Sequence, residues 1–208
     1  MPKMPLPEKV APHKTALIVV DMQNDYCHPE GSLGQRGYST EASQAIVPAL
    51  NGLIEAARQS GVSIIFIQTI HTDATDSDVW LERSHHSRSI CRPGSFGAEF
   101  FGVKPQPQDL IIHKHRYSAF IGTRLDQVLR RLKVETLIMT GVATNVCVES
   151  TARDGFMLDY HIVFLSDCTA TSHADAHAAT LANINRHFGV VATAEEVINA
   201  WTRLPILV

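Results

Sequence analysis

The sequence lacks the features that mark membrane-spanning, secreted and nucleic-acid-binding proteins. Its longest apolar runs, such as residues 16–20 and 62–67, are far shorter than the roughly 20 residues that cross a bilayer. The stretch 1–14 contains four prolines and no apolar core, so it does not resemble a secretory signal. The formal net charge of −3 supplies no broad basic field. We therefore expect a small-molecule partner, and neither a nucleic acid nor a membrane.

Cysteine is also scarce, and its spacing excludes the common metal and redox motifs. The four cysteines, at positions 27, 91, 147 and 168, form no C-x-x-C pair. In a chain of this size without a signal peptide, such cysteines are better interpreted as thiols than as disulfides. This pattern predicts a reducing, cytoplasmic location.

The length and composition are those of one globular domain. A chain of 208 residues that is 45% hydrophobic can bury a sizeable core, and it is short for two domains. We expect residues 1–14 to be an N-terminal tether and residues 15–208 to form the domain.

Short apolar segments alternate with helical patterns along most of the chain. Thr15 to Asp21 is a β-branched run typical of a buried parallel strand, and residues 43–60 repeat apolar side chains at helical spacing before a second strand at 62–68. The alternation predicts a three-layer α/β/α sandwich with a central, mostly parallel, Rossmann-like sheet of about six strands. The later expected elements are strands at 109–114, 135–141, 160–167 and near Val190, and helices at 123–132, 145–158 and 194–201.

Residues 71–108 interrupt this rhythm with polar residues, glycines and prolines. An excursion of this length between strands is often functional. It leaves the sheet at the carboxyl end of a strand, where ligands bind in open α/β folds. We therefore expect it to form a wall of the pocket.

Asp21, Lys114 and Cys147 each fall at or just beyond the carboxyl end of an expected strand. These ends share one edge of a parallel sheet, so the three side chains can converge there. A cysteine near a helix N-terminus and an ammonium is stabilised as a thiolate nucleophile, and a nearby carboxylate can carry its proton. The pattern predicts cysteine-dependent catalysis.

Each of the three residues also has an ordinary structural interpretation. A cysteine on a buried helix face is commonly a small apolar filler. An aspartate that ends a strand is often a cap or turn residue, and a lysine is usually solvated. Position alone leaves both interpretations open.

Two motifs make the chain resemble a known family. DMQNDY at 21–26 and GVATNVCVESTARDGFMLDY at 141–160 are similar to the isochorismatase-like cysteine hydrolases, and the resemblance runs from about Thr15 to Trp201. It implies that Asp21, Lys114 and Cys147 form a catalytic triad. It also implies a cis peptide at Val142-Ala143 and an oxyanion hole made by the N–H groups of Ala143 and Cys147. Thr144 would support this turn or cap the following helix.

The same resemblance implies a reaction. The Cys147 thiolate would attack a carbonyl, expel ammonia or an amine, and leave a thioester that water activated at Asp21 hydrolyses. Lys114 would lower the thiol pKa and hold the carboxylate. No metal or other cofactor is implied, and members of the family commonly form homodimers or homotetramers.

HRYSAF at 115–120, together with 143–160, looks closest to the branch of ureidoacrylate amidohydrolases and related enzymes that act on carbamoyl or ureido groups. The substrate expected from this likeness is a small linear amide, ureido or carbamoyl compound such as ureidoacrylate, biuret, triuret or an N-carbamoyl amino acid. Residues 71–101 depart from that branch. Candidates for substrate binding are Gln68, Asn145 and Thr144 as polar groups and Tyr117 and Phe120 as aromatics, with Trp80 and Phe96 as further aromatics that can equally be core. Gly97, Ala98 and Glu99, in PGSFGAEF, are expected to have a structural or oligomeric role and not a catalytic one.

Three alternatives remain open at this stage. The first is a nicotinamidase-like amidase of other carboxamides, although the Asp-x-His metal motif of those enzymes is reversed here as His71, Thr72, Asp73. His85 and His86 could ligate zinc, but surface histidines are the simpler interpretation. The second is a non-hydrolytic binding protein on the same fold. The third is a redox sensor in which Cys147 pairs with Cys27 or Cys91.

Overall fold

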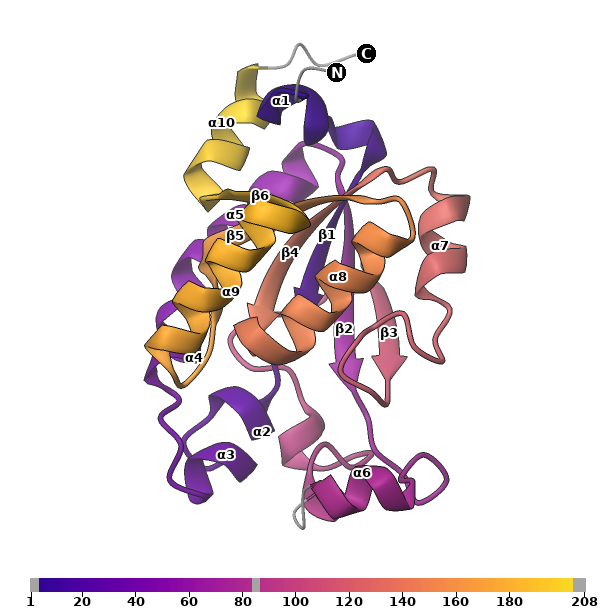
Figure 1. The fold of residues 1–208 in the computed structure, drawn as a ribbon, viewed down its shortest axis with the longest axis vertical. Coiled ribbons are helices and arrows are strands. Elements are labelled where there is room, and N and C mark those ends of the chain that lie inside the picture. Colours follow the sequence, from indigo (N-terminus) through magenta and orange to yellow (C-terminus); the bar gives the residue numbers. More distant parts are fainter. Residues whose placement is uncertain (1–3, 84–86, 204–208) are drawn as a thin grey trace.

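The computed structural model describes residues 4–83 and 87–203, and these form an α/β/α sandwich around one sheet (Figure 1). All six strands are parallel and lie in the order β3-β2-β1-β4-β5-β6. This arrangement confirms the predicted fold class. The strands are β1 (Thr15–Val20), β2 (Ser63–Thr69), β3 (Leu110–Lys114), β4 (Thr136–Val142), β5 (His161–Ala170) and β6 (Gly189–Ala192).

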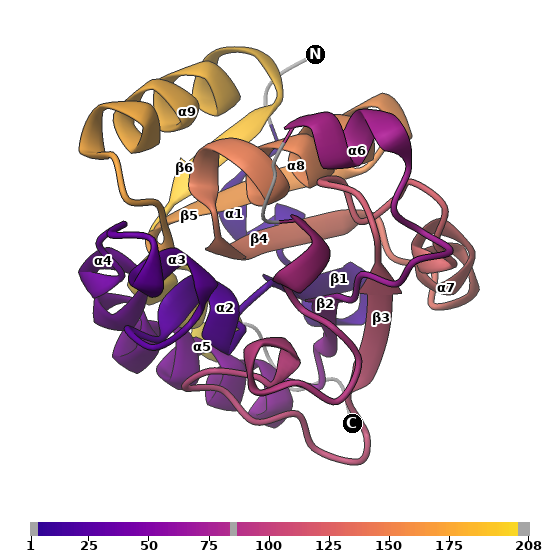
Figure 2. The ribbon, with the colours of Figure 1, turned by 90° about the horizontal axis from the view of Figure 1, so that it is seen from below.

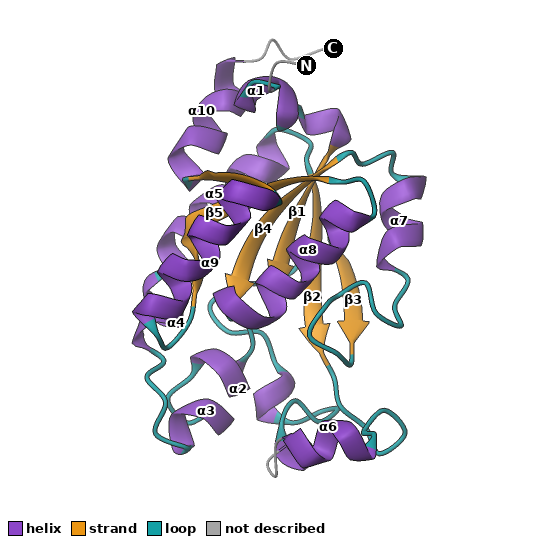
Figure 3. Cartoon of the chain, viewed as in Figure 1, coloured by secondary structure: helices purple, strands orange, loops and turns teal. Residues whose placement is uncertain are grey.

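Helices cover both faces of the sheet (Figure 3). Apolar residues of one face pack with α5 (Val47–Gln59) and α10 (Ala194–Arg203), and those of the other face pack with α7 (Leu125–Arg131), α8 (Glu149–Met157) and α9 (Ala174–His187). None of the described helices is long and apolar enough to cross a membrane.

Strand β1 shows why a continuous apolar run forms the centre of the sheet. All six of its residues are buried. Leu17 and Val19 belong to the core under α5 and α10, whereas Ile18 and Val20 belong to the core under α7 and α8. Successive side chains of a strand point to opposite faces, so a strand covered on both faces must be apolar at every position.

Short segments surround the carboxyl ends of the strands (Figure 2). Two of them, α2 (Asn24–Cys27) and α3 (Ser32–Gln35), follow β1. The excursion after β2 contributes α6 (Asp78–Arg83) and two 3-10 turns, Ser87–Ser89 and Phe96–Ala98. Together they build the surroundings of the sheet edge where the sequence analysis placed the reactive side chains.

Three of the differences from the sequence-based expectations concern the N-terminal segment, the first long helix and α9. The described part of the expected tether contains α1 (Leu6–Lys9) and the 3-10 turn Pro12–Lys14, and Val10 is fully buried. The Val10 carbonyl accepts a 2.8 Å hydrogen bond from the Trp201 indole, so residues 4–14 pack on the domain. The helix expected at 43–60 is divided into α4 (Glu41–Ala45) and α5. Helix α9 was not predicted.

Candidate active site

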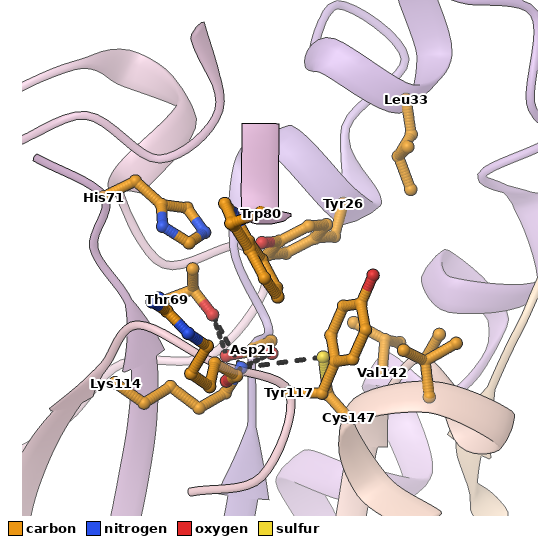
Figure 4. Close-up of a pocket in the computed structure, with 13 residues that line it drawn as sticks. Asp21, Tyr26, Leu33, Thr69, His71, Trp80, Lys114, Tyr117, Val142 and Cys147 are labelled. Carbon is orange, nitrogen blue, oxygen red and sulfur yellow. Dashed lines mark hydrogen bonds and ion pairs between the residues drawn. The ribbon is translucent and has the colours of Figure 1, made fainter. Parts of the chain in front are cut away.

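The structure brings Asp21, Lys114 and Cys147 together at the carboxyl edge of the sheet (Figure 4). Asp21 directly follows β1, Lys114 ends β3, and Cys147 lies in a π-helical turn (Thr144–Val148) between β4 and α8. Lys114 Nζ is 2.8 Å from Asp21 Oδ2 and 3.5 Å from Cys147 Sγ. The convergence expected from the strand ends is therefore present in the geometry.

The backbone at this edge has the uncommon conformations that concentrate at functional sites. Asp21 adopts a φ of 50°, in the left-handed region that non-glycine residues rarely occupy. Cys147 lies in a π-helical turn. Such turns occur mostly as single turns within α-helices, and frequently at functional sites. The cis peptide expected at Val142-Ala143 is present.

Thr69, the last residue of β2, joins the carboxylate to the ammonium and was missed in the sequence analysis. Its hydroxyl donates to Asp21 Oδ1 at 2.9 Å and accepts from Lys114 Nζ at 2.8 Å. Lys114 Nζ also donates to the backbone carbonyl of Arg116 at 3.0 Å. The Lys114 ammonium thus contacts four oxygen or sulfur atoms. The Thr69 hydroxyl contacts both members of the ion pair, so that Asp21, Thr69 and Lys114 form a closed ring of interactions.

This ion pair is almost completely removed from water. The Asp21 and Lys114 side chains are each 1% exposed. Asp21 Oδ2 has no well-aligned hydrogen bond among the described residues. Its contact with Lys114 Nζ at 2.8 Å is therefore mainly electrostatic. Desolvating two charges costs several kcal/mol per ion, and the pair persists only because each charge compensates the other. Buried pairs of this kind are candidates for function more than for stability.

The protonation state of Cys147 depends on burial as well as on its charged neighbours. Burial raises the pKa of the Cys147 thiol, and the nearby Lys114 ammonium offsets this only in part, so the pKa is about 12. The negative charge of Asp21 raises the thiol pKa further. The resting side chain is therefore a neutral thiol beside a carboxylate. For Lys114, burial lowers the pKa, but Asp21 and Cys147 raise it more, so it remains an ammonium.

A cavity of about 170 Å³ opens above these groups. It is smaller than the roughly 300 Å³ at the lower limit of pockets for drug-sized ligands, so it suits a small substrate. Trp80 and Tyr117 form an aromatic wall with ring centroids 4.9 Å apart. The lining residues are Asp21, Tyr26, Leu33, Thr69, His71, Trp80, Lys114, Arg116, Tyr117, Val142, Ala143, Val146 and Cys147.

The expected pocket wall and the residues of the expected oxyanion hole lie at this cavity. His71 and Trp80, from the excursion after β2, line it. Ala143 and Cys147 line it on the side of the π-helical turn. Their roles as oxyanion donors stay a prediction.

Of the other aromatic candidates, Tyr117 lines the cavity, whereas two lie elsewhere. Phe120 stacks on Tyr160 at 6.0 Å and packs against the core under α7 and α8. Phe96 is 48% exposed and packs edge-on against His28. Neither ring lines this cavity.

The three polar candidates are also absent from the cavity lining. Gln68 donates to the Ala98 carbonyl at 2.8 Å, because it points to the opposite face of β2 from Thr69. The Thr144 hydroxyl pairs with His177 Nδ1 at 2.9 Å and does not cap the helix. Asn145 has a buried Oδ1 without a hydrogen-bond partner among the described residues. The element PGSFGAEF serves the scaffold, as expected, through the carbonyls of Ala98 and Glu99.

His71 is buried beside the cavity and faces a carboxylate. Burial lowers the pKa of His71 to about 4, although Asp76 opposes the shift, so the ring is neutral at pH 7. Its Nδ1 lies 3.5 Å from Asp76 Oδ1, and Arg92 Nη2 lies 2.5 Å from Asp76 Oδ2. Asp73 is fully exposed.

No group of three or more potential metal ligands occurs within residues 4–83 and 87–203. His85 and His86 lie outside the described residues. The four thiols are all unpaired and buried, and burial raises the pKa of each. A low-pKa redox pair of Cys147 with Cys27 or Cys91 therefore has no support in these environments.

Several known proteins are similar to this chain over most of its length. The family sequence model of the isochorismatase domain matches residues 15–196 of this chain. The chain is 37% identical to a protein of Caulobacter vibrioides named ureidoacrylate amidohydrolase RutB, with 93% of each chain covered. It is 34% identical to a cysteine hydrolase of Pseudomonas syringae pv. phaseolicola of known structure, with a TM-score of 0.87 over 93% of this chain and 95% of that chain. An N-carbamoylsarcosine amidase from Thermoplasma acidophilum is 27% identical, with a TM-score of 0.74 over 88% of this chain and 97% of that chain.

Proposed function

This chain belongs to the isochorismatase family, and from that premise we propose that it is a cysteine-dependent amidohydrolase that cleaves a C–N bond of a small ureido or carbamoyl compound. The observation that carries the proposal is the contact of one buried ammonium, Lys114, with both the Asp21 carboxylate and the Cys147 thiol. A thiol, a carboxylate and a fixed positive charge thus line one small cavity, as a nucleophile with a nearby proton carrier would require.

The protonation states set the order of the first step. Because burial keeps Cys147 as a thiol, its proton must leave as the sulfur attacks the substrate carbonyl. Asp21 accepts that proton, and the sulfur forms a bond to the carbonyl carbon. The N–H groups of Ala143 and Cys147 are the proposed donors to the carbonyl oxygen, which becomes negative in the tetrahedral intermediate.

The second half of the reaction returns every group to its starting state. Protonated Asp21 gives its proton to the leaving nitrogen, the C–N bond breaks, and an amine or ammonia departs. For a urea R–NH–CO–NH₂ that loses R–NH₂, Cys147 then carries a carbamoyl thioester. Asp21 takes a proton from water, the hydroxyl adds to the carbonyl, and the thiol leaves with that proton. The released carbamic acid decomposes to ammonia and carbon dioxide.

Lys114 acts in this scheme by charge and position. It keeps the Asp21 carboxylate next to the sulfur and offsets negative charge on the sulfur as the proton departs. Its ammonium stays protonated, because Asp21 and Cys147 raise its pKa against the effect of burial. It does not carry the transferred proton.

The substrate class follows from the cavity and from the relatives. The cavity of about 170 Å³ admits a small linear molecule. The relative from Caulobacter vibrioides is named for ureidoacrylate, and the N-carbamoylsarcosine amidase is named for a carbamoyl compound. A ureido group offers the planar carbonyl and the leaving nitrogen that the scheme needs. We favour it over an unrelated carboxamide.

The setting of the enzyme is part of the proposal. The four unpaired, buried thiols fit a reducing cytoplasm. The net charge of −3 offers little attraction to nucleic acids or anionic membranes. We propose a homodimer or homotetramer, as the family resemblance implies, and one domain at residues 15–208 on which residues 4–14 pack.

Ammonia release tests the proposal. Wild-type protein treated with EDTA should release ammonia from ureidoacrylate, and Cys147→Ala should not. Cys168→Ala is the matched control, because it removes another buried, unpaired thiol that does not line the cavity. Release from nicotinamide alone, lost on EDTA treatment, would contradict the proposal. So would turnover that survives in Cys147→Ala.

A further inference from the structure

Arg116 stands at the boundary between the active-site cavity and the surface. It lines the cavity that holds Asp21 and Cys147. It also lines an outer hollow whose other residues are Ser77, Val79, Trp80, Glu82 and Tyr117. A substrate with its carbonyl at Cys147 and its far end toward the mouth must pass this arginine.

The backbone and side chain of Arg116 are both held in place. Its carbonyl accepts from Lys114 Nζ at 3.0 Å. Its Nη1 donates to the carbonyls of Thr75 at 2.9 Å and His115 at 2.6 Å, and the guanidinium carbon lies 5.2 Å from the centre of the Trp80 ring. Within the described residues, its hydrogen bonds all use Nη1. Within the same part of the chain no hydrogen bond engages the N–H groups on Nε and Nη2, which leaves these donors for a ligand.

Arg116 also determines the net charge of the cavity lining. The charges of Asp21 and Lys114 cancel each other in their ion pair. His71 and Cys147 are neutral at pH 7, with pKa values of about 4 and about 12. Arg116 is therefore the one uncompensated charge among the residues that line the cavity.

The nearest acidic groups do not neutralise this charge. Glu82 lines only the outer hollow and is exposed, so water screens its charge. Asp76 is paired with Arg92 behind His71. A cavity with one net positive charge, in a partly desolvated wall, is complementary to a substrate with one negative charge.

We propose that Arg116 binds the carboxylate at the far end of the substrate, and so makes the enzyme selective for ureido acids over uncharged ureas. The inference rests on the proposed function, because it assumes that the reacting carbonyl lies at Cys147. A guanidinium offers paired N–H donors that match the two oxygens of a carboxylate, which an ammonium does not. The guanidinium lies over the Trp80 ring, and this cation–π contact helps to fix its orientation. Arg116 is a specificity-determining residue in this account.

The test compares 3-ureidoacrylate with its uncharged methyl ester, using ammonia release. The wild-type enzyme should prefer the acid. In Arg116→Gln, kcat/KM for the acid should fall about 10- to 100-fold, the range expected for a hydrogen bond to a charged group. The loss should appear in KM, because the carboxylate contact is the same in the ground state and the transition state. The ester should change by less than about twofold by the same reasoning.

Two further variants separate carboxylate binding from loss of structure. Arg116→Lys keeps the charge without the paired donors, and should recover part of the preference for the acid. Arg58→Gln is the matched control, because Arg58 also ties down the excursion after β2, through the Lys104 carbonyl, and neither Arg58 nor its ion-pair partner Asp109 lines the cavity. It should leave the ratio of acid to ester unchanged, even if both rates fall. An equal loss of both substrates in Arg116→Gln would overturn the proposal.

Binding distinguishes this inference from the proposed function. Calorimetry with Cys147→Ala measures affinity for 3-ureidoacrylate without turnover, and Arg116→Gln in that background should weaken it about 10- to 100-fold. Equal turnover of acid and ester by the wild-type enzyme would overturn the inference and leave the amidohydrolase standing. No Cys147-dependent turnover of either substrate, with no binding of the acid, would overturn both.

Discussion

Thr69 offers the sharpest test of how the site is held together, because one hydroxyl bridges the carboxylate and the ammonium. It donates to Asp21 Oδ1 at 2.9 Å and accepts from Lys114 Nζ at 2.8 Å, and the residue is 2% exposed. Thr69→Val has nearly the same shape and removes both interactions. The carboxylate then loses a donor, and the ammonium loses one of its acceptors.

The size of the effect follows from the charges of the two partners. A hydrogen bond to a charged group contributes about 1.5 to 3 kcal/mol, so the loss of two should lower the free energy of unfolding by about 3 kcal/mol or more. For a chain of this length, about 3 kcal/mol corresponds to a fall in Tm of about 6 to 12 °C. Asp21 also becomes less well positioned as proton carrier, and kcat should fall about 10- to 100-fold.

Thr140→Val is the matched control. Thr140 is also a fully buried threonine on a central strand, and its hydroxyl donates only to the neutral Ile18 carbonyl at 2.8 Å. Thr140→Val should lower the free energy of unfolding by about 1 kcal/mol and leave kcat nearly unchanged. Thr69→Ser keeps the hydroxyl and should restore most of the activity. Thermal unfolding and steady-state kinetics measure both quantities, and equal effects of Thr69→Val and Thr140→Val would refute this reasoning.

Three further predictions follow from the protonation states and the backbone. With the Cys147 pKa at about 12, its alkylation by iodoacetamide should rise about tenfold per pH unit from about pH 7 to 10; a plateau below about pH 8 would show a resting thiolate. His71 has a pKa of about 4, below its unfolded value, so the unfolded state binds more protons between about pH 6.5 and 4. Its share of stability, about 3 kcal/mol, is lost as the pH falls through that window. In His71→Asn, the free energies of unfolding measured with urea at about pH 4.5 and pH 7 should therefore differ by less than in the wild-type protein. An unchanged difference would refute the assignment. Gly141 has a φ of 100°, and an added Cβ would lie 2.0 Å from the Val20 carbonyl oxygen, so Gly141→Ala should lower stability by at least about 1 to 3 kcal/mol. Gly52→Ala, in α5 with open space around it, should instead raise stability by about 0.5 to 1 kcal/mol in the same unfolding assay, and similar effects of the two changes would contradict the backbone argument.

The convergence of Asp21, Lys114 and Cys147 was predictable from the sequence because each lies at or just beyond the carboxyl end of a strand of one parallel sheet. The register of such a sheet brings the carboxyl ends of its strands to one edge. Thr69 was missed because the second strand was expected to end at Gln68, one residue too early. In a strand, that single residue decides which side chain faces the site.

Helix α9 and the protonation state of Cys147 were not predictable for different reasons. The sequence ADAHAATLANINRH buries only Thr180 and Ile184, so α9 has little of the apolar periodicity that marks a helix. For Cys147, the sequence displays Lys114 and a helix start, which lower a thiol pKa, but not the depth of burial that raises it. Burial is a property of the assembled fold.

The most direct test of the central claim is the covalent intermediate itself. Wild-type protein quenched in acid during turnover of 3-ureidoacrylate, digested and examined by mass spectrometry, should carry a carbamoyl group on the peptide that contains Cys147. Cys91→Ala removes another buried thiol near the site and should give the same adduct. A carbamoyl group on Cys27 or Cys91 instead, or turnover that persists in Cys147→Ala, would contradict the claim that Cys147 is the nucleophile.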